Sequence, residues 1–365
     1  MKISIITRHA ITNYGSLLQA FATQTILQKL GYRSEIIDYI RDDESYQNHE
    51  ITLLKQKKNW YDNPIKRIIY LIFRQPESIL AGYKFEKERK KMLVMSRTYK
   101  SFEDLANNPP IADIYITGSD QVWGPIENGS YDSSYCLSFT KKKKIAYGAS
   151  FGHIKMTPNL KKYYKDMLSQ YNHISVRENS AVQILNDLGI KAKQVLDPTL
   201  LLDETYWKCY FEPIKSKKYI LVYQLHNDKN LGDYAKKLAK TKKLPLIRIS
   251  SSFHQIIRGG RFKWCPTIGQ FLSYLKNAEC IITDSFHGTA FAINFNTPFI
   301  EIIPNNGTET RNLSILQLTG LTERILYNRN NLDLINKPID FSSANTILLQ
   351  ERKKSINILK KMIEE

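Results

Sequence analysis

Short apolar stretches alternate with helical segments along most of the chain, and this alternation is the feature that most constrains the fold. Residues 3–6 predict a strand, residues 17–30 have helical periodicity that ends at Gly31, and residues 34–39 predict the next strand. A strand, a helix and a second strand in this order form a βαβ unit, whose two strands lie parallel. The chain is therefore predicted to be an α/β protein with mostly parallel sheets.

The alternation continues after a basic stretch and then begins a second time. In the first series, further strands are predicted at residues 114–117, 144–149, 173–176 and 194–196. In the second series, strands are predicted at residues 218–223, 245–249, 280–283 and 299–303. Because 365 residues exceed what one hydrophobic core usually supports, we predict two Rossmann-like domains that face a cleft, a GT-B-like architecture. The first would span residues 1–205 with a basic insertion at 41–105, and the second residues 206–365 with a long final helix.

Basic residues dominate the charge, since 53 lysines and arginines against 35 acids give +18. Half of this excess lies in residues 51–100, where thirteen basic residues and four acids give +9. Aromatic and aliphatic residues accompany them, as on surfaces that bind anionic lipid. The alternative is a helical insertion whose apolar face packs on its own domain while the lysines are simply solvated. No recognised DNA- or RNA-binding motif accompanies the charge, so we expect no nucleic-acid partner.

Three features favour a cytoplasmic protein. No apolar run reaches the ~18 residues needed to span a bilayer. The first residues lack the apolar core and cleavage site of a signal peptide. The cysteines (Cys136, Cys209, Cys265 and Cys280) are widely spaced, which suits a reducing compartment and argues against a structural zinc site. We expect a cytoplasmic location, peripheral at the inner face of the membrane if the basic stretch binds lipid.

One histidine occupies a position that suits chemistry on an anion. Residues 280–283 predict a buried strand, and a helix is predicted from Thr289, so His287 would lie between a strand end and a helix start. Backbone N–H groups and the helix dipole favour an anion there, and ligands bind at this edge of open α/β sheets. An imidazole at such a place predicts proton transfer on an anionic substrate. The alternative is a histidine that caps the helix or is hydrogen-bonded in the core.

Six motifs occur in order along the chain, and together they resemble the polysaccharide pyruvyl transferase family. They lie at residues 13–20 (NYGSLLQA), 117–123 (TGSDQVW), 147–152 (YGASFG), 175–178 (SVRE), 196–199 (LDPT) and 283–288 (TDSFHG). The resemblance covers nearly the whole chain apart from residues 40–100. It implies a GT-B-like fold and transfer of the enolpyruvyl group of phosphoenolpyruvate onto sugar hydroxyls. The product would be a pyruvate ketal on a bacterial capsular, exopolysaccharide or cell-wall glycan.

This resemblance implies substrates for each half of the chain. The first domain would be the acceptor side and would receive a glycan, lipid-linked or destined for a polymer. The second domain would bind the anionic donor, phosphoenolpyruvate. Acidic residues 42–44 do not form a convincing metal-binding motif, so we expect a metal-independent reaction without a cofactor.

The predicted catalytic residues are His287, as acid and base, and Asp120, which would deprotonate or position the sugar hydroxyl. The alternative for Asp120 is a helix N-cap. Arg177, at a strand end, would clamp a carboxylate or phosphate, and its alternative is a salt bridge to Glu178 or another nearby carboxylate. Trp123 would stack on a sugar ring unless it belongs to the core. The remaining predicted substrate-binding residues are Gly288, Thr289, Ser285, Asn13, Tyr14, Gly15, Ser119, Ser150 and Arg311.

Two other functions compete with pyruvyl transfer. One is a GT-B glycosyltransferase in which the histidine loop grips the diphosphate of a nucleotide sugar. The other is a non-catalytic scaffold of a glycan-assembly complex. The combination of His287, Arg177 and Asp120 speaks against a scaffold, which has no need of these residue types at strand ends.

Overall fold

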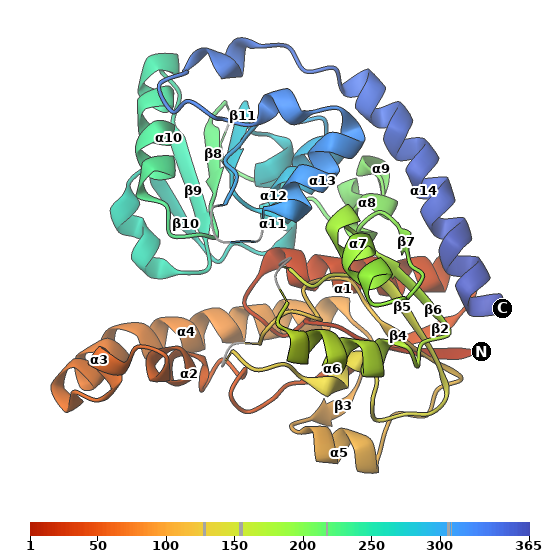
Figure 1. Cartoon of the computed structure of the whole chain (residues 1–365). Coiled ribbons are helices and arrows are strands. Elements are labelled where there is room, and N and C mark those ends of the chain that lie inside the picture. Colours follow the sequence, from red (N-terminus) through yellow and green to blue (C-terminus); the bar gives the residue numbers. More distant parts are fainter. Residues whose placement is uncertain (127–128, 153–155, 217, 305–306, 308) are drawn as a thin grey trace. The chain divides into compact units, whose positions relative to one another are not determined.

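Two parallel sheets organise the chain, one in each of two compact units (Figure 1). The computed structural model describes residues 1–126, 129–152, 156–216, 218–304, 307 and 309–365. The first unit comprises Met1–Pro198 with Lys354–Glu365, and the second comprises Thr199–Lys353. The sequence-predicted boundary after residue 205 therefore lies inside the second unit. The predicted α/β class with mostly parallel sheets is confirmed.

The first unit contains a seven-stranded sheet with the order β3-β2-β1-β4-β5-β6-β7. All neighbouring strands pair in parallel. This is the strand order of a doubly wound sheet, whose ligands bind at the carboxyl ends of the strands. The strands are β1 (Lys2–Ile6), β2 (Arg33–Tyr39), β3 (Met95–Tyr99), β4 (Ile114–Thr117), β5 (Lys143–Ala149), β6 (His173–Val176) and β7 (Lys193–Gln194).

Helices of the first unit follow the strands as the sequence pattern predicts. Asn13 caps α1, because its side chain accepts a hydrogen bond from the Gly15 N–H at 2.8 Å. Buried aromatic residues, among them Trp123, Phe151 and Tyr164, fill one core of this unit. Apart from the helices at residues 49–92, the helices of this unit are α1 (Tyr14–Lys29), α5 (Phe102–Asn107), η1 (Ser133–Cys136), α6 (Pro158–Leu168), α7 (Asn179–Asp187) and the last turns of α14 (Phe341–Glu364).

The basic insertion forms three helices and an edge strand. They are α2 (His49–Lys55), α3 (Lys58–Tyr61), α4 (Pro64–Met92) and β3. Asn63 starts α4, because its side chain accepts hydrogen bonds from the N–H groups of Ile65 and Lys66, and Pro64 suits the first helical position. Figure 1 shows α3 and the first part of α4 extending beyond the sheet of this unit.

The second unit contains a five-stranded parallel sheet with the order β10-β9-β8-β11-β12. The strands are β8 (Ile220–Tyr223), β9 (Leu246–Ser250), β10 (Arg261–Trp264), β11 (Cys280–Thr283) and β12 (Phe299–Glu301). The helices are α8 (Pro198–Leu201, at the junction), α9 (Glu204–Lys208), α10 (Lys229–Lys242), η2 (Phe253–Arg258), α11 (Ile268–Lys276), α12 (Phe286–Asn294), α13 (Thr310–Thr319), η3 (Thr322–Arg324), η4 (Asp333–Asn336) and most of α14. The sequence pattern did not predict β10, because its four residues are charged and aromatic and follow two glycines.

Candidate functional site

His287 lies in the first turn of α12, directly after β11, in the second unit. Ser285 is the N-cap of this helix, since its hydroxyl accepts a hydrogen bond from the Gly288 N–H at 3.3 Å. The imidazole is almost fully buried, with 5% of the residue exposed. His287 thus lies at the predicted strand-to-helix connection, but the helix begins at Phe286, before the predicted Thr289, so His287 lies within its first turn. Ser285 uses its side chain within the cap.

Gly288 lets α12 approach the sheet. A Cβ atom added at this position would overlap the Thr283 hydroxyl and lie 3.1 Å from the Tyr223 ring. Every other residue type would therefore push the start of α12 away from β11 and β8. Gly288 thus fixes the position of His287 at the carboxyl edge of this sheet.

Asp284 ties two loops of this edge together. Its carboxylate accepts hydrogen bonds from the N–H groups of Leu225 at 2.7 Å and His226 at 3.0 Å, and it is buried. These two residues follow β8, which is the neighbour of β11 in the sheet. The loop after β8 and the loop that carries His287 are therefore held as one structure.

Glu301, at the end of β12, is a buried carboxyl group that the sequence analysis did not select. Burial raises its pKa to about 8. Asn312 donates a hydrogen bond to Glu301 Oε1 at 2.6 Å, and the Thr289 hydroxyl contacts Oε2. Thr289 also donates to the Ser285 carbonyl oxygen at 3.1 Å. The Thr289 hydroxyl has only one proton, which it can donate to the Ser285 carbonyl oxygen. If Glu301 is protonated, its O–H can donate to the Thr289 oxygen, so both contacts are hydrogen bonds.

These contacts correct the expectation that the Thr289 hydroxyl binds substrate. Thr289 is fully buried, and its hydroxyl is engaged by Ser285 and Glu301. Its side chain stabilises the first turn of α12 from within the protein. Arg311, another predicted binding residue, lies half-buried in the first turn of α13.

Two arginines of the second unit form a positively charged pair near the ends of β8 and β9. Arg248 is fully buried on β9, where Nη1 donates to Gln224 Oε1 at 3.1 Å and Nε donates to the Gly259 carbonyl oxygen at 3.4 Å. Burial, together with the charge of Arg258, lowers the pKa of Arg248 to about 10. Arg258 donates to Asn227 Oδ1 at 2.7 Å.

Neutral oxygens are the only hydrogen-bond partners that these two guanidinium groups have among the described residues. Arg248 Nη2 and Arg258 Nη1 are buried and have no hydrogen-bond partner there. Buried cations are normally paired with an acid, so this pair is a candidate anion site. The sequence signal for Arg248 is a charged residue inside an apolar strand (LIRIS).

Arg177, in the first unit, has the opposite environment. Its Nη1 donates to Asp197 Oδ2 at 2.9 Å, Nη2 lies 3.4 Å from Asp120 Oδ1, and Nε lies 3.6 Å from Glu178 Oε2. Burial alone would lower the pKa of Arg177, but these carboxylates outweigh it and raise the pKa. The salt bridge considered as an alternative from the sequence is therefore present. The clamping of a substrate by Arg177 stays a prediction.

Asp120 is held in an unusual backbone conformation at the end of β4. Its φ of 85° lies in the left-handed region, which is rare outside glycine and is found more often at functional sites. Its carboxylate accepts hydrogen bonds from the Ser16 hydroxyl at 2.5 Å and from the Gln121 N–H at 2.8 Å. Ser16 was not selected from the sequence, although it lies in the first motif. The acid/base role of Asp120 stays a prediction.

Trp123 belongs to the core, which corrects the expectation that it stacks on a sugar. Only 1% of the residue is exposed, and its ring packs against Phe151 at 5.1 Å and Tyr171 at 6.3 Å. The indole N–H donates to the Tyr135 carbonyl oxygen at 3.3 Å. The ring is thus enclosed by the protein.

The other predicted binding residues of the first unit also support its structure. The Ser119 hydroxyl donates to Asp197 at 2.8 Å, and the Ser150 hydroxyl accepts from the Gly152 N–H at 3.1 Å. Tyr14 is buried, with its ring 4.8 Å from that of Phe85. Asn13 and Gly15 form the cap of α1 described above. The structure thus gathers Asp120, Ser119 and Arg177 into one cluster and places His287 in the other unit.

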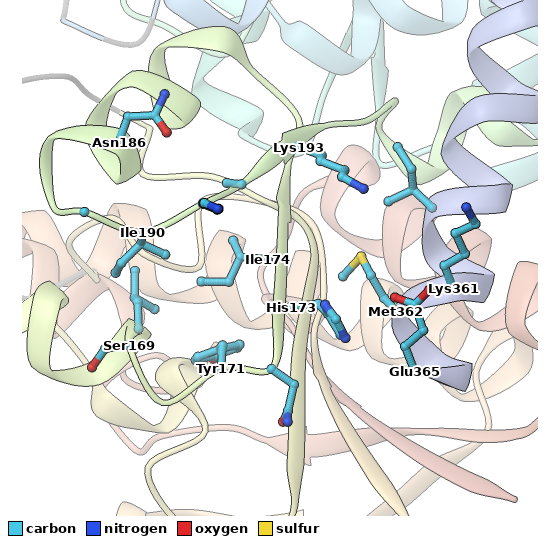
Figure 2. A pocket seen from close by; sticks show the side chains of 16 residues that line it. Ser169, Tyr171, His173, Ile174, Asn186, Ile190, Lys193, Lys361, Met362 and Glu365 are labelled. Atoms are coloured by element: carbon cyan, nitrogen blue, oxygen red, sulfur yellow. The ribbon is translucent and has the colours of Figure 1, made fainter.

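Two pockets lie within the first unit. One, of about 400 Å³, is at the carboxyl ends of β2 and β3, and its polar lining includes Asp38, Asp42, Glu86, Arg89, Lys90 and Lys100. The other, of about 810 Å³, lies at the amino ends of β6 and β7 beside the last turns of α14 (Figure 2). Ligands of open α/β sheets bind at carboxyl ends, so the first pocket has the more suitable position.

Asp38 links the smaller pocket to the loop after β1. His9 Nε2 lies 2.9 Å from Asp38 Oδ1, and the Thr98 hydroxyl donates to Oδ2 at 2.5 Å. Burial would raise the pKa of Asp38, but these bonds and the charge of Arg89 outweigh it and lower the pKa. The pocket therefore contains a firmly ionised carboxylate beside a buried guanidinium.

The described residues offer neither a cluster of metal-binding side chains nor a helix that could span a membrane. No group of three or more His, Cys, Asp or Glu side chains there could hold a metal ion. Metal independence itself stays a prediction. None of the helices within those same ranges is long and apolar enough to cross a bilayer.

Solved structures share this fold at low sequence identity. A putative UDP-N-acetylglucosamine 2-epimerase from Listeria monocytogenes has a TM-score of 0.52 and 10% identity, covering 95% of this chain and 90% of that chain. UDP-GlcNAc 2-epimerase from Neisseria meningitidis, bound to UDP-GlcNAc, has a TM-score of 0.51 and 13% identity. The match covers 100% of this chain and 99% of that chain. Arabidopsis thaliana UGT89C1, complexed with UDP-L-rhamnose, has a TM-score of 0.51 and 8% identity. The match covers 99% of this chain and 98% of that chain. Such identities show the fold alone, and that fold is GT-B-like.

Family membership rests on a different comparison. No curated protein matches the chain significantly. The family model for polysaccharide pyruvyl transferase, however, matches residues 13–307, which include all six motifs and every strand except β1. A match of this length covers most of the chain. The chain therefore belongs to the polysaccharide pyruvyl transferase family.

Proposed function

We propose that this protein transfers the enolpyruvyl group of phosphoenolpyruvate onto two hydroxyls of a sugar in a bacterial surface glycan. Family membership supports a transferase that modifies a polysaccharide. The observation that carries the choice of donor is the arrangement in the second unit. There, a buried histidine at a helix start and an arginine pair that hydrogen-bonds to no carboxylate of the described residues lie at the carboxyl edge of one sheet. Such an edge suits a small substrate with a carboxylate and a phosphate.

The reaction balances without an oxidant or a further co-substrate. The methylene carbon of phosphoenolpyruvate gains a proton, and a sugar oxygen bonds to the central carbon. The bond between that carbon and the phosphate oxygen breaks, and a second sugar oxygen takes its place to close the ketal. The two sugar hydroxyls release two protons. One accounts for the proton that turned the methylene carbon into a methyl group, and the other leaves with phosphate.

His287 is the proposed acid and base of these steps. An imidazole can donate and accept a proton near neutral pH, as protonation of carbon and deprotonation of a hydroxyl require. The N–H groups at the start of α12 and the guanidinium groups of Arg248 and Arg258 would hold the anionic groups of the donor. Asp120 in the first unit is the proposed partner of the sugar hydroxyl.

The pocket of about 400 Å³ in the first unit is the proposed site for the part of the acceptor glycan beyond the reacting hydroxyl, since Asp120 is not among its lining residues. It offers carboxylates as acceptors (Asp38, Asp42 and Glu86) and side-chain donors (Arg89, Lys90 and Lys100). A sugar, whose hydroxyls both donate and accept, suits such a mixed lining. The volume lies in the ordinary range for small-molecule sites.

A glycosyltransferase that uses a nucleotide sugar is the second candidate. The arginine pair favours it too, because two guanidinium groups also suit a diphosphate. This chain would then use the same edge of the second sheet for a different donor. A scaffold without activity would use neither donor.

Calorimetric titration separates these functions. We expect phosphoenolpyruvate to bind the wild type, and UDP-GlcNAc and CMP-sugars not to bind. Arg248→Met should weaken phosphoenolpyruvate binding. Binding of nucleotide sugars alone would overturn the donor, and binding of neither would favour the scaffold.

His287→Asn tests catalysis apart from binding. The variant should bind phosphoenolpyruvate within a few-fold of the wild type. Its release of phosphate in the presence of an acceptor glycan should fall by about 10²–10⁴, the range for loss of a general acid or base. Unchanged phosphate release would remove His287 from the mechanism.

A further inference from the structure

Exposed apolar side chains form a stripe along α4. They are Ile65, Ile68, Ile69, Ile72, Phe73, Ile79, Leu80 and Tyr83, each 38–75% exposed. Each of these residues has another member of the set three or four positions away along the chain, which places them on one face of the helix. Trp60 of α3, 42% exposed, adds an aromatic ring near the start of α4. We call these nine residues the α4 stripe.

Other residues of α4 attach it to the first unit. The Tyr70 hydroxyl donates to Glu50 Oε2 of α2 at 2.7 Å, and Arg74 pairs with the same carboxylate at 3.4 Å. Ala81, Gly82, Phe85 and Arg89 are the buried residues of the helix. The helix is thus fixed without the α4 stripe. Packing on its own domain, the alternative considered from the sequence, does not account for these nine side chains.

Basic residues flank the stripe. Lys66, Lys84, Lys87, Lys90 and Lys91 of α4 are exposed, as are Lys55, Lys57 and Lys58 at and beside α2 and α3. Residues 51–100 carry a net charge of +9. An exposed apolar face of this size on a soluble unit indicates a contact surface, and the charge selects an anionic one.

We propose that the α4 stripe docks on an anionic lipid bilayer, with α4 lying in the interface and its lysines on lipid headgroups. Helices that bind membranes in this way combine an apolar face of aliphatic and aromatic residues with flanking lysine and arginine. A second copy of the chain fits less well, because two surfaces of the same strong positive charge repel each other. The proposal stands on α4 alone and does not depend on pyruvyl transfer.

The same helix connects this surface to the proposed acceptor pocket. Glu86, Arg89 and Lys90, in the last turns of α4, line the pocket of about 400 Å³. Docking would therefore place that pocket near the headgroup region of the bilayer. A glycan attached to a lipid could then enter the pocket while its lipid stays in the membrane.

Vesicle flotation tests the proposal on the full chain. We expect the wild type to float with vesicles of phosphatidylcholine and phosphatidylglycerol, and much less with phosphatidylcholine alone. Replacing Ile72 and Phe73 together by serine should reduce binding by about tenfold or more, because two large apolar side chains no longer enter the bilayer. The matched control is Ile111→Ser, which changes an 83% exposed isoleucine outside α4 and should bind as the wild type does.

A second set of variants and a sedimentation measurement complete the test. Replacing Lys66, Lys84, Lys87 and Lys91 by glutamine should reduce binding to the anionic vesicles and remove most of its salt dependence. Equal binding by the Ile72/Phe73 variant and the wild type would overturn the proposal. The proposal would also be overturned if sedimentation showed that the wild type is a dimer, that it does not bind vesicles and that the Ile72/Phe73 variant is a monomer. The α4 stripe would then join two copies of the chain. All substituted residues are exposed, and circular dichroism with a thermal unfolding curve checks that each variant is folded.

Discussion

Arg177 in the first unit and Arg248 in the second are both buried, but their surroundings are opposite. Arg177 contacts three carboxylates, and its pKa is raised in spite of burial. Arg248 has neutral oxygen partners, and burial together with the charge of Arg258 outweighs the charge of Asp284 and lowers its pKa to about 10. The first arrangement holds a protein together. The second leaves positive charge for a ligand to neutralise, which is why we place the donor there.

Stability should distinguish the two arginines most strongly. Arg177→Met leaves three buried carboxylates without their cation, so the free energy of unfolding should fall by about 3–5 kcal/mol. Arg248→Met removes a buried charge that hydrogen-bonds to no carboxylate of the described residues, and the loss should stay below about 1.5 kcal/mol. Chemical denaturation of both variants at neutral pH measures the difference. Equal losses would show that the two environments are energetically alike.

Glu301 extends the comparison to an acid, because it too is buried in the second unit without a counter-charge. Its pKa is about 8, against an ordinary value of 4.5. Between these pH values the folded state keeps a proton that the unfolded state has lost. The contribution of Glu301 protonation to the free energy of unfolding is therefore complete below about pH 4.5. It decreases by ~1.4 kcal/mol per pH unit up to about pH 8, and above that pH it no longer changes.

Glu301→Gln should remove this pH dependence, since glutamine keeps the shape and hydrogen bonds of the neutral acid. The variant should match the wild type near pH 5 and exceed its free energy of unfolding by a few kcal/mol at pH 9, about 1.4 kcal/mol for each pH unit crossed. Denaturation curves at several pH values measure this. The control is Glu103→Gln at an exposed site. Parallel profiles for wild type and Glu301→Gln would show that Glu301 is already ionised in the folded protein.

Donor affinity should show the next largest effect. Arg248→Met should weaken phosphoenolpyruvate binding by about tenfold or more, as expected when a charged hydrogen-bonding partner of an anion is lost. Calorimetry measures the dissociation constant, and Lys229→Met, a cation outside the pair, is the control. An unchanged constant would separate the arginine pair from the donor site.

Arg258→Gln should have the smallest effect. This arginine is partly exposed, so water and salt screen its charge and the affinity for phosphoenolpyruvate should fall only a few-fold, about 1 kcal/mol or less. The loss should shrink further at high salt. If Arg258→Gln lost more affinity for phosphoenolpyruvate than Arg248→Met, Arg258 would be the more important of the two arginines for donor binding.

Much of the fold could be predicted from local patterns. The βαβ periodicity predicted parallel sheets, and both observed sheets are parallel. The strand-to-helix location of His287 followed from an apolar run that ends just before it. Strand β10 was not predicted, because charged and aromatic residues after two glycines lack the apolar pattern of a buried strand.

Side-chain partners were harder to predict than positions. The sequence selected Arg177 but left open whether it binds substrate or carboxylates, since two of those acids, Asp120 and Asp197, are distant in the chain. The sequence left open whether Trp123 stacks on a sugar or belongs to the core, because the aromatic rings that enclose it come from other elements. Nothing in the motifs pointed to Glu301 or Arg248.

The sequence by itself determined the α/β class, the family and the order of the strand-end motifs, because these depend on residue type and spacing along the chain. Only the tertiary structure decided which charges are compensated, which aromatic rings are covered and which face of α4 stays exposed. Those properties depend on neighbours brought together through space, and the free energy of a charge or an apolar surface is set by these neighbours.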